Sequence, residues 1–572
     1  MTSSLHAVAT TNHLTRRVTA LDSEPVLSSV RAELPTLLEH HFVVGHLIAI
    51  GAVTLFNRTA IAQTLQRDGV ALTDNCADGE ILLHLYARYG ARGFALADGM
   101  FVLAILDRDE MVLARDHAGT RALFYTWIDN RWLASRSLRA LRRQRDRNAR
   151  LDLNAMRAFL TFAYLPGDET LIEGVYKVLP GRCLRLRNDG SCQEEIFWEP
   201  REEQWDEYTP AETYAQRLRH LLEEAVRVRL PADQDVGVFL SGGIDSSLVT
   251  ALATRLHHRT VRTYSINFGH HLPNELAYSG LVATHCRTEH TILTFDGQQI
   301  ADHLAETVAL LDCPVGDPLT TPNLLLSRAA ARDGLTVILN GEGGDPVFGG
   351  PKNLPMIVFE LHRDDPTPAA RARAYLLSYR KCYDQLERLL SADVYDALRA
   401  APSLERHVQP YLEAPQMSSF LNRLLYTNIR TKGAHHILPK VERLTTACGL
   451  EGRSPLFAPS LIDAAFAIPP RLKLRGLDEK WILKQAVRDL LPIPILTRPK
   501  SGMMVPVQHW LQGPLRDLAN DLLFGPRARA RGLFREATAR SWIQGQGMVW
   551  RRHGQSIWLL ITLELWLRAY DL

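Results

Sequence analysis

The chain has 572 residues, of which 46% are apolar and 23% are charged, so it is long enough for two or more domains with substantial cores. Its formal net charge of +3 is too small to indicate nucleic-acid binding. Seven scattered cysteines show neither metal-ligand nor redox-pair spacing, and no secretory signal pattern is present. We therefore expect a cytoplasmic globular protein that binds neither nucleic acid nor a membrane, and the oligomeric state is left open.

The N-terminal part of the chain, 1–205, is dominated by short apolar patterns of the kind that form strands. Strands are predicted at 42–50, 53–56, 101–106, 111–115 and 123–127, and helices at 60–65 and 79–89. Strands in series with only two helices among them predict a mixed α+β domain. A polar, acidic stretch at 202–207 then leads to a long amphipathic helix at 214–229, which opens the second domain, 206–572.

In the second domain, strand and helix patterns alternate. Strands are predicted at 235–240, 261–268, 290–294 and 335–340, with helices at 246–253 and 275–286. Such alternation predicts a doubly wound parallel sheet that is covered by helices on both faces, so the fold class is α/β. After residue 350 the chain becomes mainly helical, and its apolar run at 557–567 is too short to cross a bilayer. We predict that this run is a packed helix.

One turn is unusually informative because it joins a buried strand, ending at Leu240, to a helix through serines and glycines. Its sequence is Ser241-Gly242-Gly243-Ile244-Asp245-Ser246-Ser247. Two glycines let the backbone approach an anion closely, and the unpaired N–H groups of the helix start point toward it. The turn lacks both the Gly-Lys-Ser/Thr of a P-loop and the spaced glycines of a dinucleotide-binding turn. It is therefore predicted to be a phosphate cradle of another kind.

A second glycine-rich turn follows the strand at 335–340. Its sequence is Gly341-Glu342-Gly343-Gly344-Asp345. In an open α/β sheet, ligands bind beyond the carboxyl ends of the strands, so turns that are distant in sequence converge there. Each of the two turns supplies one aspartate, Asp245 and Asp345, and paired carboxylates beside phosphates suit Mg²⁺. We therefore expect both turns to form one site for a magnesium-bound phosphate compound.

The order of several motifs resembles the asparagine synthetase superfamily, including the β-lactam synthetases and lasso-peptide cyclases. The first turn is similar to the SGG-x-DSS loop of enzymes that split ATP between its α- and β-phosphates. Segments similar to a class II glutaminase domain are 55–58, 77–83, 113–119 and 179–181. Segments similar to the synthetase domain are 312–318, 341–350, 449–456, 498–503 and 563–567. The resemblance implies an Ntn-hydrolase-like sandwich domain, followed by a parallel-sheet ATP-pyrophosphatase domain with a helical C-terminal part.

The resemblance also implies roles for individual residues. The nucleotide would be held by Leu240, Ser241, Gly242, Gly243, Asp245, Ser246, Ser247, Ser265, Ile266 and Gly341, and Mg²⁺ by Asp245 and Asp345. Lys500 would stabilise charge at the α-phosphate, and Glu342 would remove a proton from the amine that attacks the activated acid. Lys352 would either face a substrate carboxylate or lie in solvent. ATP and Mg²⁺ are thus the expected cofactors.

One departure from the family concerns the glutaminase reaction. A class II glutaminase needs a cysteine directly after the initiator methionine, and this chain has Thr2 there, with no other cysteine among residues 1–20. We therefore expect the first domain to be a degenerate glutamine amidotransferase-like domain, folded but without glutamine hydrolysis. The nitrogen would come from an amine substrate or from free ammonia.

These expectations combine into a hypothesis for the reaction. The chain is predicted to adenylate a small-molecule or peptide carboxylate, release pyrophosphate, and transfer the acyl group to an amine. In antibiotic or other natural-product biosynthesis this would be an intramolecular cyclisation of β-lactam or lasso-peptide type, the latter with precursor-peptide-processing partner proteins. The alternative is an asparagine synthetase that uses ammonia, which Glu342 favours. A catalytically dead scaffold and a tRNA-modifying pyrophosphatase are less consistent with the intact motifs and the absence of a basic RNA-binding domain.

Overall fold

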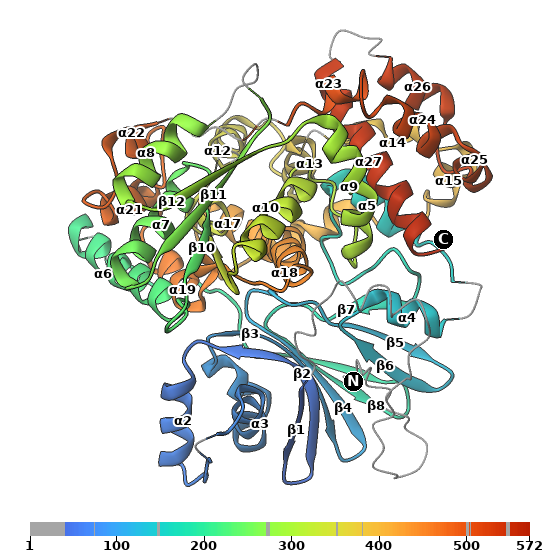
Figure 1. Ribbon diagram of the computed structural model, residues 1–572. Helices are drawn as coiled ribbons and strands as arrows, with labels where there is room; N and C mark the ends of the chain where they lie inside the picture. Colours follow the sequence, from blue (N-terminus) through green and yellow to red (C-terminus); the bar gives the residue numbers. More distant parts are fainter. Residues whose placement is uncertain are drawn as a thin grey trace.

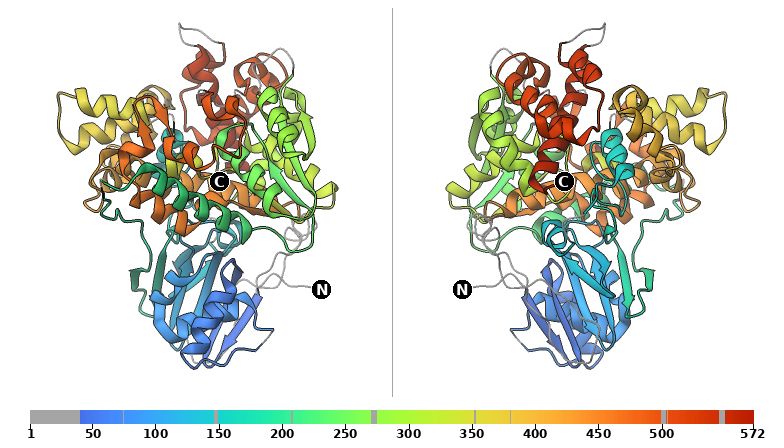
Figure 2. Two further views of the ribbon diagram at one scale, coloured as in Figure 1. Left: turned by 90° about the vertical axis from the view of Figure 1, so that its left-hand side faces the viewer. Right: turned by 90° about the vertical axis from the view of Figure 1, so that its right-hand side faces the viewer.

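The computed structural model describes residues 40–73, 75–145, 149–206, 208–269, 275–350, 353–379, 381–498, 503, 505–544 and 550–572. Figure 1 shows a strand-rich N-terminal domain, in blue and cyan, below a second domain that contains a parallel sheet and many helices. The views in Figure 2 place the same N-terminal domain beneath the helical body from both sides. The α/β fold class with two unlike domains is therefore confirmed.

The N-terminal domain is a sandwich built on two antiparallel sheets. The larger sheet has the order β1-β2-β3-β4-β8-β9, and its strands are β1 (His40–Val44), β2 (Leu47–Leu55), β3 (Gly99–Asp107), β4 (Glu110–Arg115), β8 (Arg182–Arg187) and β9 (Cys192–Ile196). The smaller sheet has the order β6-β5-β7, with β5 (Phe124–Ile128), β6 (Arg131–Ser135) and β7 (Val175–Lys177). Helices α2 (Arg58–Arg67) and α3 (Asp78–Tyr89) cover the outer face of the larger sheet.

Strand β3 shows why this sequence forms a sandwich. Phe101 and Leu103 pack with residues of α2 and α3, whereas Val102 and Ala104 pack with residues of the smaller sheet. Successive side chains of a strand point to opposite faces, so a continuous apolar run requires burial on both. The run in β3 therefore places this strand in the middle layer of the domain.

The first predicted strand was wrong in one respect. Strands were predicted at 42–50 and 53–56, but in the structure β1 and β2 form a hairpin whose turn is Gly45-His46. Gly45 has φ of +60°, a conformation that glycine adopts without steric cost and that reverses the chain in a two-residue turn. Both predicted segments after this turn belong to the single strand β2.

The second domain contains a five-stranded sheet whose strand pairs are all parallel. The strands are β10 (Val236–Phe239), β11 (Val261–Asn267), β12 (Glu289–Thr294), β13 (Val337–Asn340) and β14 (Glu451–Arg453), in the order β12-β11-β10-β13-β14. Four of them were predicted. The fifth, β14, was missed because three residues give no periodic signal, and it returns to the sheet edge after a long helical excursion.

Helices cover both faces of this sheet, which confirms the doubly wound prediction. On one face, Val236 and Leu339 share an apolar cluster with α6 (Ala211–Arg227) and α7 (Ile244–Leu256). On the other face, Tyr264 and Ile338 pack with α9 (Gly297–Leu310) and α10 (Thr320–Arg332). Strand β10 pairs with β11 on one side and with β13 on the other. The chain first runs from β10 through β11 to β12 and then crosses back to β13, so the strand order reverses between β10 and β13. Ligands of such sheets bind at the carboxyl ends of the strands at this point.

The two halves of the chain share their largest apolar core. Helix α5 (Leu153–Phe162), which the sequence analysis did not predict, packs with the C-terminal helix α27 (Trp550–Ala569) in one cluster. Helix α27 contains the predicted packed segment 557–567, whose Trp558 and Trp566 are fully buried. None of the helices in the described part of the chain has the length and apolar character needed to cross a bilayer.

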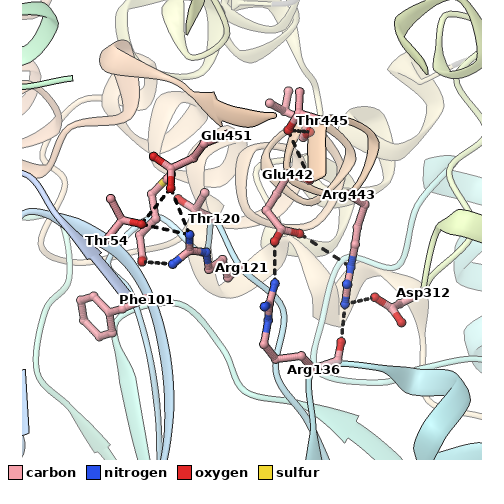
Figure 3. A network of polar contacts seen from close by, with 12 residues as sticks. Thr54, Phe101, Thr120, Arg121, Arg136, Asp312, Glu442, Arg443, Thr445 and Glu451 are labelled. Atoms are coloured by element: carbon pink, nitrogen blue, oxygen red, sulfur yellow. Dashed lines mark hydrogen bonds and ion pairs between the residues drawn. The ribbon is translucent and has the colours of Figure 1, made fainter. Parts of the chain in front are cut away.

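Buried ion pairs also join the halves. Figure 3 shows Arg136 of the N-terminal half against Glu442 of α18 (Leu438–Thr446), at 2.6 Å. Arg443 of the same helix donates to the carbonyl oxygen of Arg136 and forms an ion pair with Asp312 of its own domain. Nearby, Arg121 lies 3.5 Å from Glu451 of β14. All of these side chains are largely shielded from solvent. The N-terminal half therefore contacts one helix and one edge strand of the second domain through buried ion pairs.

We predict that Arg136→Met destabilises the protein, because it leaves the buried Glu442 carboxylate without its 2.6 Å partner. Breaking a buried pair costs about 3 kcal/mol of the free energy of unfolding, measurable by urea denaturation. Arg399→Met is the matched control, since the Arg399–Asp396 pair is 74% and 60% exposed and should change stability by less than about 0.5 kcal/mol. Equal stability of the two variants would contradict this account of the interface.

Candidate active site

The two glycine-rich turns line one cavity of about 320 Å³ at the carboxyl ends of β10 and β13. Its walls include Ser241, Gly243, Asp245 and Ser246 from the first turn, and Gly341, Glu342, Gly343 and Asp345 from the second. The reversal of strand order brings these turns together although a hundred residues separate them. The structure therefore places Ser241 and Asp345 at one site, as expected.

The first turn is arranged as an anion site. Helix α7 begins at Ile244, and no side chain caps its N-terminus at Gly243. The Ser246 hydroxyl accepts from the backbone N–H of Ser241 at 3.1 Å and lies 3.1 Å from the Ser241 hydroxyl. These contacts fix the turn while the first N–H groups of α7 stay available to a ligand. Such a helix start favours negative charge.

The turns approach so closely that only glycine has room at two positions. A Cβ atom on Gly344 would lie 2.1 Å from the carboxyl group of Asp245, and one on Gly341 would lie 2.3 Å from the backbone nitrogen of Ser246. Both distances are far below any van der Waals contact. These glycines therefore set how close the two carboxylates, Asp245 and Asp345, come to each other.

A buried lysine joins the two predicted metal ligands. The Lys480 ammonium donates to Asp245 Oδ2 at 2.6 Å and to Asp345 Oδ1 at 2.5 Å. Burial lowers the pKa of Lys480, but the two carboxylates outweigh burial and raise it, so the ammonium stays charged. Because a cation already lies between the two carboxylates, their oxygen atoms form a site that suits positive charge. Hard carboxylate oxygens of this kind are what Mg²⁺ takes, together with phosphate oxygens.

A second cation, Arg498, holds the phosphate turn through Gly242. Arg498 donates to the carbonyl oxygen of Gly242 at 3.0 Å, forms an ion pair with Glu275, and lies over the ring of Tyr278. Its side chain is 8% exposed. Arg498 begins the segment that resembles the family's catalytic-lysine loop, so this segment starts in direct contact with the first turn.

The opposite wall of the cavity carries a polar cluster on α18 and on the π-helix η4 (Ile429–Ile437). Lys440 donates to Asp317 Oδ2 at 2.7 Å, and His436 Nε2 lies 3.5 Å from the same oxygen. Burial raises the pKa of Asp317, but Lys440 and His436 hold it well below its ordinary value. Burial lowers the pKa of His436 to about 4, so this imidazole is neutral at pH 7.

Glu342 lines the same cavity. Its backbone N–H donates to Asn340 Oδ1 at 3.0 Å, and the Asn340 amide donates to the carbonyl oxygen of Arg453 in β14 at 3.0 Å. The edge strand thus orients the turn that carries Glu342. The carboxyl group of Glu342 is close enough to raise the pKa of Lys440, although burial of Lys440 acts in the opposite direction. Glu342 therefore adds an acid to the cavity wall near Lys440.

The predicted site residues can now be placed. The residues that line the cavity are Leu240, Ser241, Gly243, Asp245, Ser246, Ser265, Ile266, Gly341, Glu342 and Asp345. Gly242 lies behind the turn, and Ser247 is fully buried inside α7, so neither belongs to the cavity wall. The predicted roles of Lys500, Lys352 and Thr2 fall on residues outside the described part of the chain. All the assigned roles stay predictions.

Sequence reasoning missed Lys480 and the cluster of Asp317, Lys440, His436 and Lys432. Asp317 lies in the segment 312–318, which resembles the synthetase domain, but no role was predicted for it. Lys432 and Lys440 lie in helical segments, and Lys480 lies in the turn between β16 (Asp478–Glu479) and α21 (Trp481–Ala486), where no local motif marks it. A usable signal was present, because lysine is scarce in this chain and most basic residues are arginines.

Comparisons with known proteins agree with this geometry. A model of the asparagine synthase family matches residues 217–568, and a model of the glutamine amidotransferase domain matches residues 42–198. The glutamine-hydrolyzing asparagine synthetase 1 of Bacillus subtilis is 27% identical over 501 residues, covering 82% of this chain and 77% of the relative. Asparagine synthetase 3 of the same organism is 26% identical over 469 residues, covering 78% and 74%. Amidase chry2 of Gibberella zeae is 23% identical over 522 residues, covering 78% and 75%.

The fold and the cavity define an asparagine synthetase-like, ATP-dependent enzyme that forms amide bonds. The chain belongs to the asparagine synthase family of AMP-forming carbon–nitrogen ligases, and it carries an N-terminal glutamine amidotransferase domain.

We predict that Gly344→Ala weakens binding of MgATP, because the new Cβ atom would displace Asp245 from the second turn. A loss of about tenfold in affinity, or about 1.4 kcal/mol, should be measurable by titration calorimetry. Gly280→Ala in α8 (Leu276–Cys286) is the control, since its Cβ atom would meet no atom within 4 Å. Unchanged affinity in the Gly344 variant would mean that the close approach of the turns does not serve the nucleotide.

Proposed function

We propose that the enzyme adenylates a substrate carboxylate, releases pyrophosphate, and joins the acyl group to an amine of the same molecule. The observation that carries the proposal is the convergence of Asp245 and Asp345 on Lys480 beside the uncapped start of α7. A carboxylate is a poor acyl donor because its oxygen leaves poorly, whereas AMP leaves readily. Negative charge develops on the departing pyrophosphate, so fixed N–H donors and cations aimed at it lower the barrier.

Each part of the first turn has a role in this step. The backbone N–H groups at Gly243 and the hydroxyls of Ser241 and Ser246 would bind phosphate oxygens. Asp245 and Asp345 would hold Mg²⁺, which supplies charge stabilisation at the phosphate oxygens. Lys480 would shift between the carboxylates and the phosphates, and Lys500, two residues beyond Arg498, would stabilise charge at the α-phosphate.

Glu342 would act as the general base for the amine. A base must lie within hydrogen-bonding reach of the proton that it removes, and Glu342 lines the cavity between the phosphate turn and the polar cluster of Asp317 and Lys440. A carboxylate there would take the proton as the amine attacks the acyl carbon. An amine of the same molecule gains a high effective concentration from being held in one cavity.

We further propose that the N-terminal domain does not hydrolyse glutamine. The cysteines of residues 1–205 are Cys76, Cys183 and Cys192. Burial raises the pKa of the Cys76 thiol to about 11 and that of Cys183 to about 12, and it also raises the pKa of Cys192. A nucleophilic cysteine needs the opposite shift. This domain would instead support the synthetase through its buried interface.

The biological setting that we propose is specialised metabolism in the cytoplasm, with a β-lactam-type or lasso-peptide-type ring as product and, for a peptide substrate, precursor-processing partners. A second candidate is an asparagine synthetase that uses ammonia. Glu342 and the names of the Bacillus subtilis relatives favour it. The raised pKa values of Cys76, Cys183 and Cys192 favour the first candidate, because an internal amine needs no ammonia supply.

We predict that Asp345→Asn reduces ATP–pyrophosphate exchange by about 10²-fold or more, because it removes one of two carboxylates at the cation site. Exchange would be measured across a set of acids and peptides with MgATP, followed by mass analysis of the product. Asp396→Asn, on the surface, is the control. Absence of exchange with every acid in the wild-type protein would end the adenylation proposal.

We predict that Thr2→Ala leaves amide-forming turnover unchanged, and that the enzyme does not hydrolyse glutamine. The measurement is product formation with an acid that supports exchange, with circular dichroism to verify folding. Loss of turnover in a folded Thr2 variant would contradict the proposal that the N-terminal domain is catalytically silent.

A further inference from the structure

One segment of the N-terminal half reaches the wall of the active-site cavity. Helix α5 ends at Phe162, and the next residue, Ala163, has φ of +69°. This left-handed conformation is uncommon for residues other than glycine, and strained positions of this kind cluster at functional sites. It turns the chain so that the buried Tyr164 faces η4, the π-helix of the second domain. The unusual backbone at Ala163 therefore directs Tyr164 into the contact between the two halves.

Tyr164 contacts η4 at two points. Its ring stacks on the imidazole of His436, with 5.5 Å between the ring centroids and 17° between the planes. Its hydroxyl lies 3.0 Å from that of Tyr379; burial raises the pKa of Tyr164, and a hydrogen bond with Thr431 acts in the opposite direction. Hydrogen bonds of a π-helix run from residue i to residue i+5, so Thr431 and His436 lie on one face of η4. In an α-helix, His435 would take the place of His436 on this face. Tyr164 therefore fits the π-helical winding.

The same turn of the N-terminal half fixes the loop that carries Asp317. The carbonyl oxygen of Ala163 accepts from the backbone N–H of Gly316 at 2.8 Å, one residue before Asp317. A Cβ atom on Gly316 would lie only 3.2 Å from the Cβ atom of Ala163, so the approach is tight. Ala163 and Tyr164 therefore hold both partners of the contact between Asp317 and His436.

This contact belongs to the polar wall of the cavity. His436 Nε2 lies 3.5 Å from Asp317 Oδ2, the oxygen that also accepts from Lys440 at 2.7 Å. Burial lowers the pKa of Lys440, but Asp317 and Glu342 raise it, so the ammonium stays charged. A neutral His436 leaves the charge of Asp317 to Lys440. The orientation of His436 therefore affects the charges beside Glu342, the proposed general base.

Tyr164 also shields His436 from water. Burial lowers the pKa of His436 to about 4, while its contact with Asp317 acts in the opposite direction. Loss of the stacked ring would admit water, the pKa would rise, and a protonated imidazole would compete with Lys440 for Asp317. In the described part of the chain, the charged or titratable side chains around this imidazole are Asp317 from the loop before α10, Lys440 from α18, Lys432 from η4 with Lys381 beyond it, Glu342 from the turn after β13, and Tyr164 itself.

We propose that Tyr164 is a positioning residue of the amide-forming reaction, which holds η4 in its π-helical winding and directs His436 at Asp317. The N-terminal half thus sets the geometry of the cavity wall that faces Glu342. This inference rests on the proposed function for the part that Glu342 plays in the reaction.

The test compares Tyr164→Leu with Tyr86→Leu. Tyr86 is a buried residue of the N-terminal domain whose hydroxyl donates to Asp107 at 2.9 Å, and it does not line the cavity. With an acid that supports ATP–pyrophosphate exchange, Tyr164→Leu should lower kcat for amide formation by about 10²-fold, while the KM for MgATP changes by less than about twofold because the phosphate turn is intact. Tyr86→Leu should keep the wild-type kcat, and Tyr164→Phe, which keeps the ring on His436, should retain most of it.

The pH profile separates positioning from a general loss of stability. In Tyr164→Leu, kcat should fall between about pH 7 and pH 5, because His436 takes up a proton in this range. The wild type should lack this fall, and the additional change His436→Gln should remove it from the leucine variant. A fall in the wild type that His436→Gln removes would overturn the inference, because Tyr164 would then not keep the imidazole neutral.

Hydrogen exchange provides a readout that needs no substrate. Amide exchange across 429–440, measured by mass spectrometry, should become faster in Tyr164→Leu and stay unchanged in Tyr86→Leu. Equal amide exchange in the two variants, or equal kcat, would overturn the inference. Absence of ATP–pyrophosphate exchange with every acid would end the adenylation proposal, and the amide-exchange result alone would then decide the role of Tyr164. If Tyr164→Leu does not fold, Tyr164→Met takes its place, because methionine adapts to irregular space.

Discussion

The site depends on one arrangement of charge, a buried ammonium held between two carboxylates that come from turns far apart in the chain. Lys480 reaches Asp245 and Asp345 across 235 and 135 residues of sequence. Two carboxylates this close would repel each other strongly inside the protein without a cation between them. The lysine keeps the pair together before any nucleotide enters. Glycines at 341 and 344 make the approach sterically possible, and the reversal of strand order between β10 and β13 makes it topologically possible.

The N-terminal domain contributes to this site through its contacts with one helix and one edge strand of the second domain. Arg136 and Arg121 pair with Glu442 and Glu451, and the second of these acids lies in the strand that orients Glu342 through Asn340. Figure 3 shows that one side of α18 faces this interface. The other side of α18, with Lys440, lines the cavity. The domain is therefore a structural part of the synthetase, because its ion pairs reach the helix and the strand that border the cavity.

The parts of the site that could be predicted from sequence are those with local signals. The two turns after β10 and β13 combine a buried strand, glycines and an acid within ten residues, and the open α/β topology then brings them together. Lys432 and Lys440 lie on helices and Lys480 in the turn before α21, and their contacts depend on tertiary packing, so no short pattern marks them. The same difference holds for the fold. Long apolar runs such as β3 and α27 were predicted, whereas the three-residue strands β7 and β14 and the two-residue turn at Gly45-His46 were not.

The late position of β14 has a consequence for synthesis on the ribosome. Val337 pairs with Glu451, so the sheet edge next to β13 stays open until more than a hundred further residues have been made. Contacts with such large sequence separation form slowly because a long loop must close first. The turn that carries Glu342 is oriented by this edge, and Lys480 and Arg498, which hold the phosphate turn in place, are made later still. The whole cavity should therefore become ordered only when synthesis is nearly complete, so a nascent chain should not consume ATP.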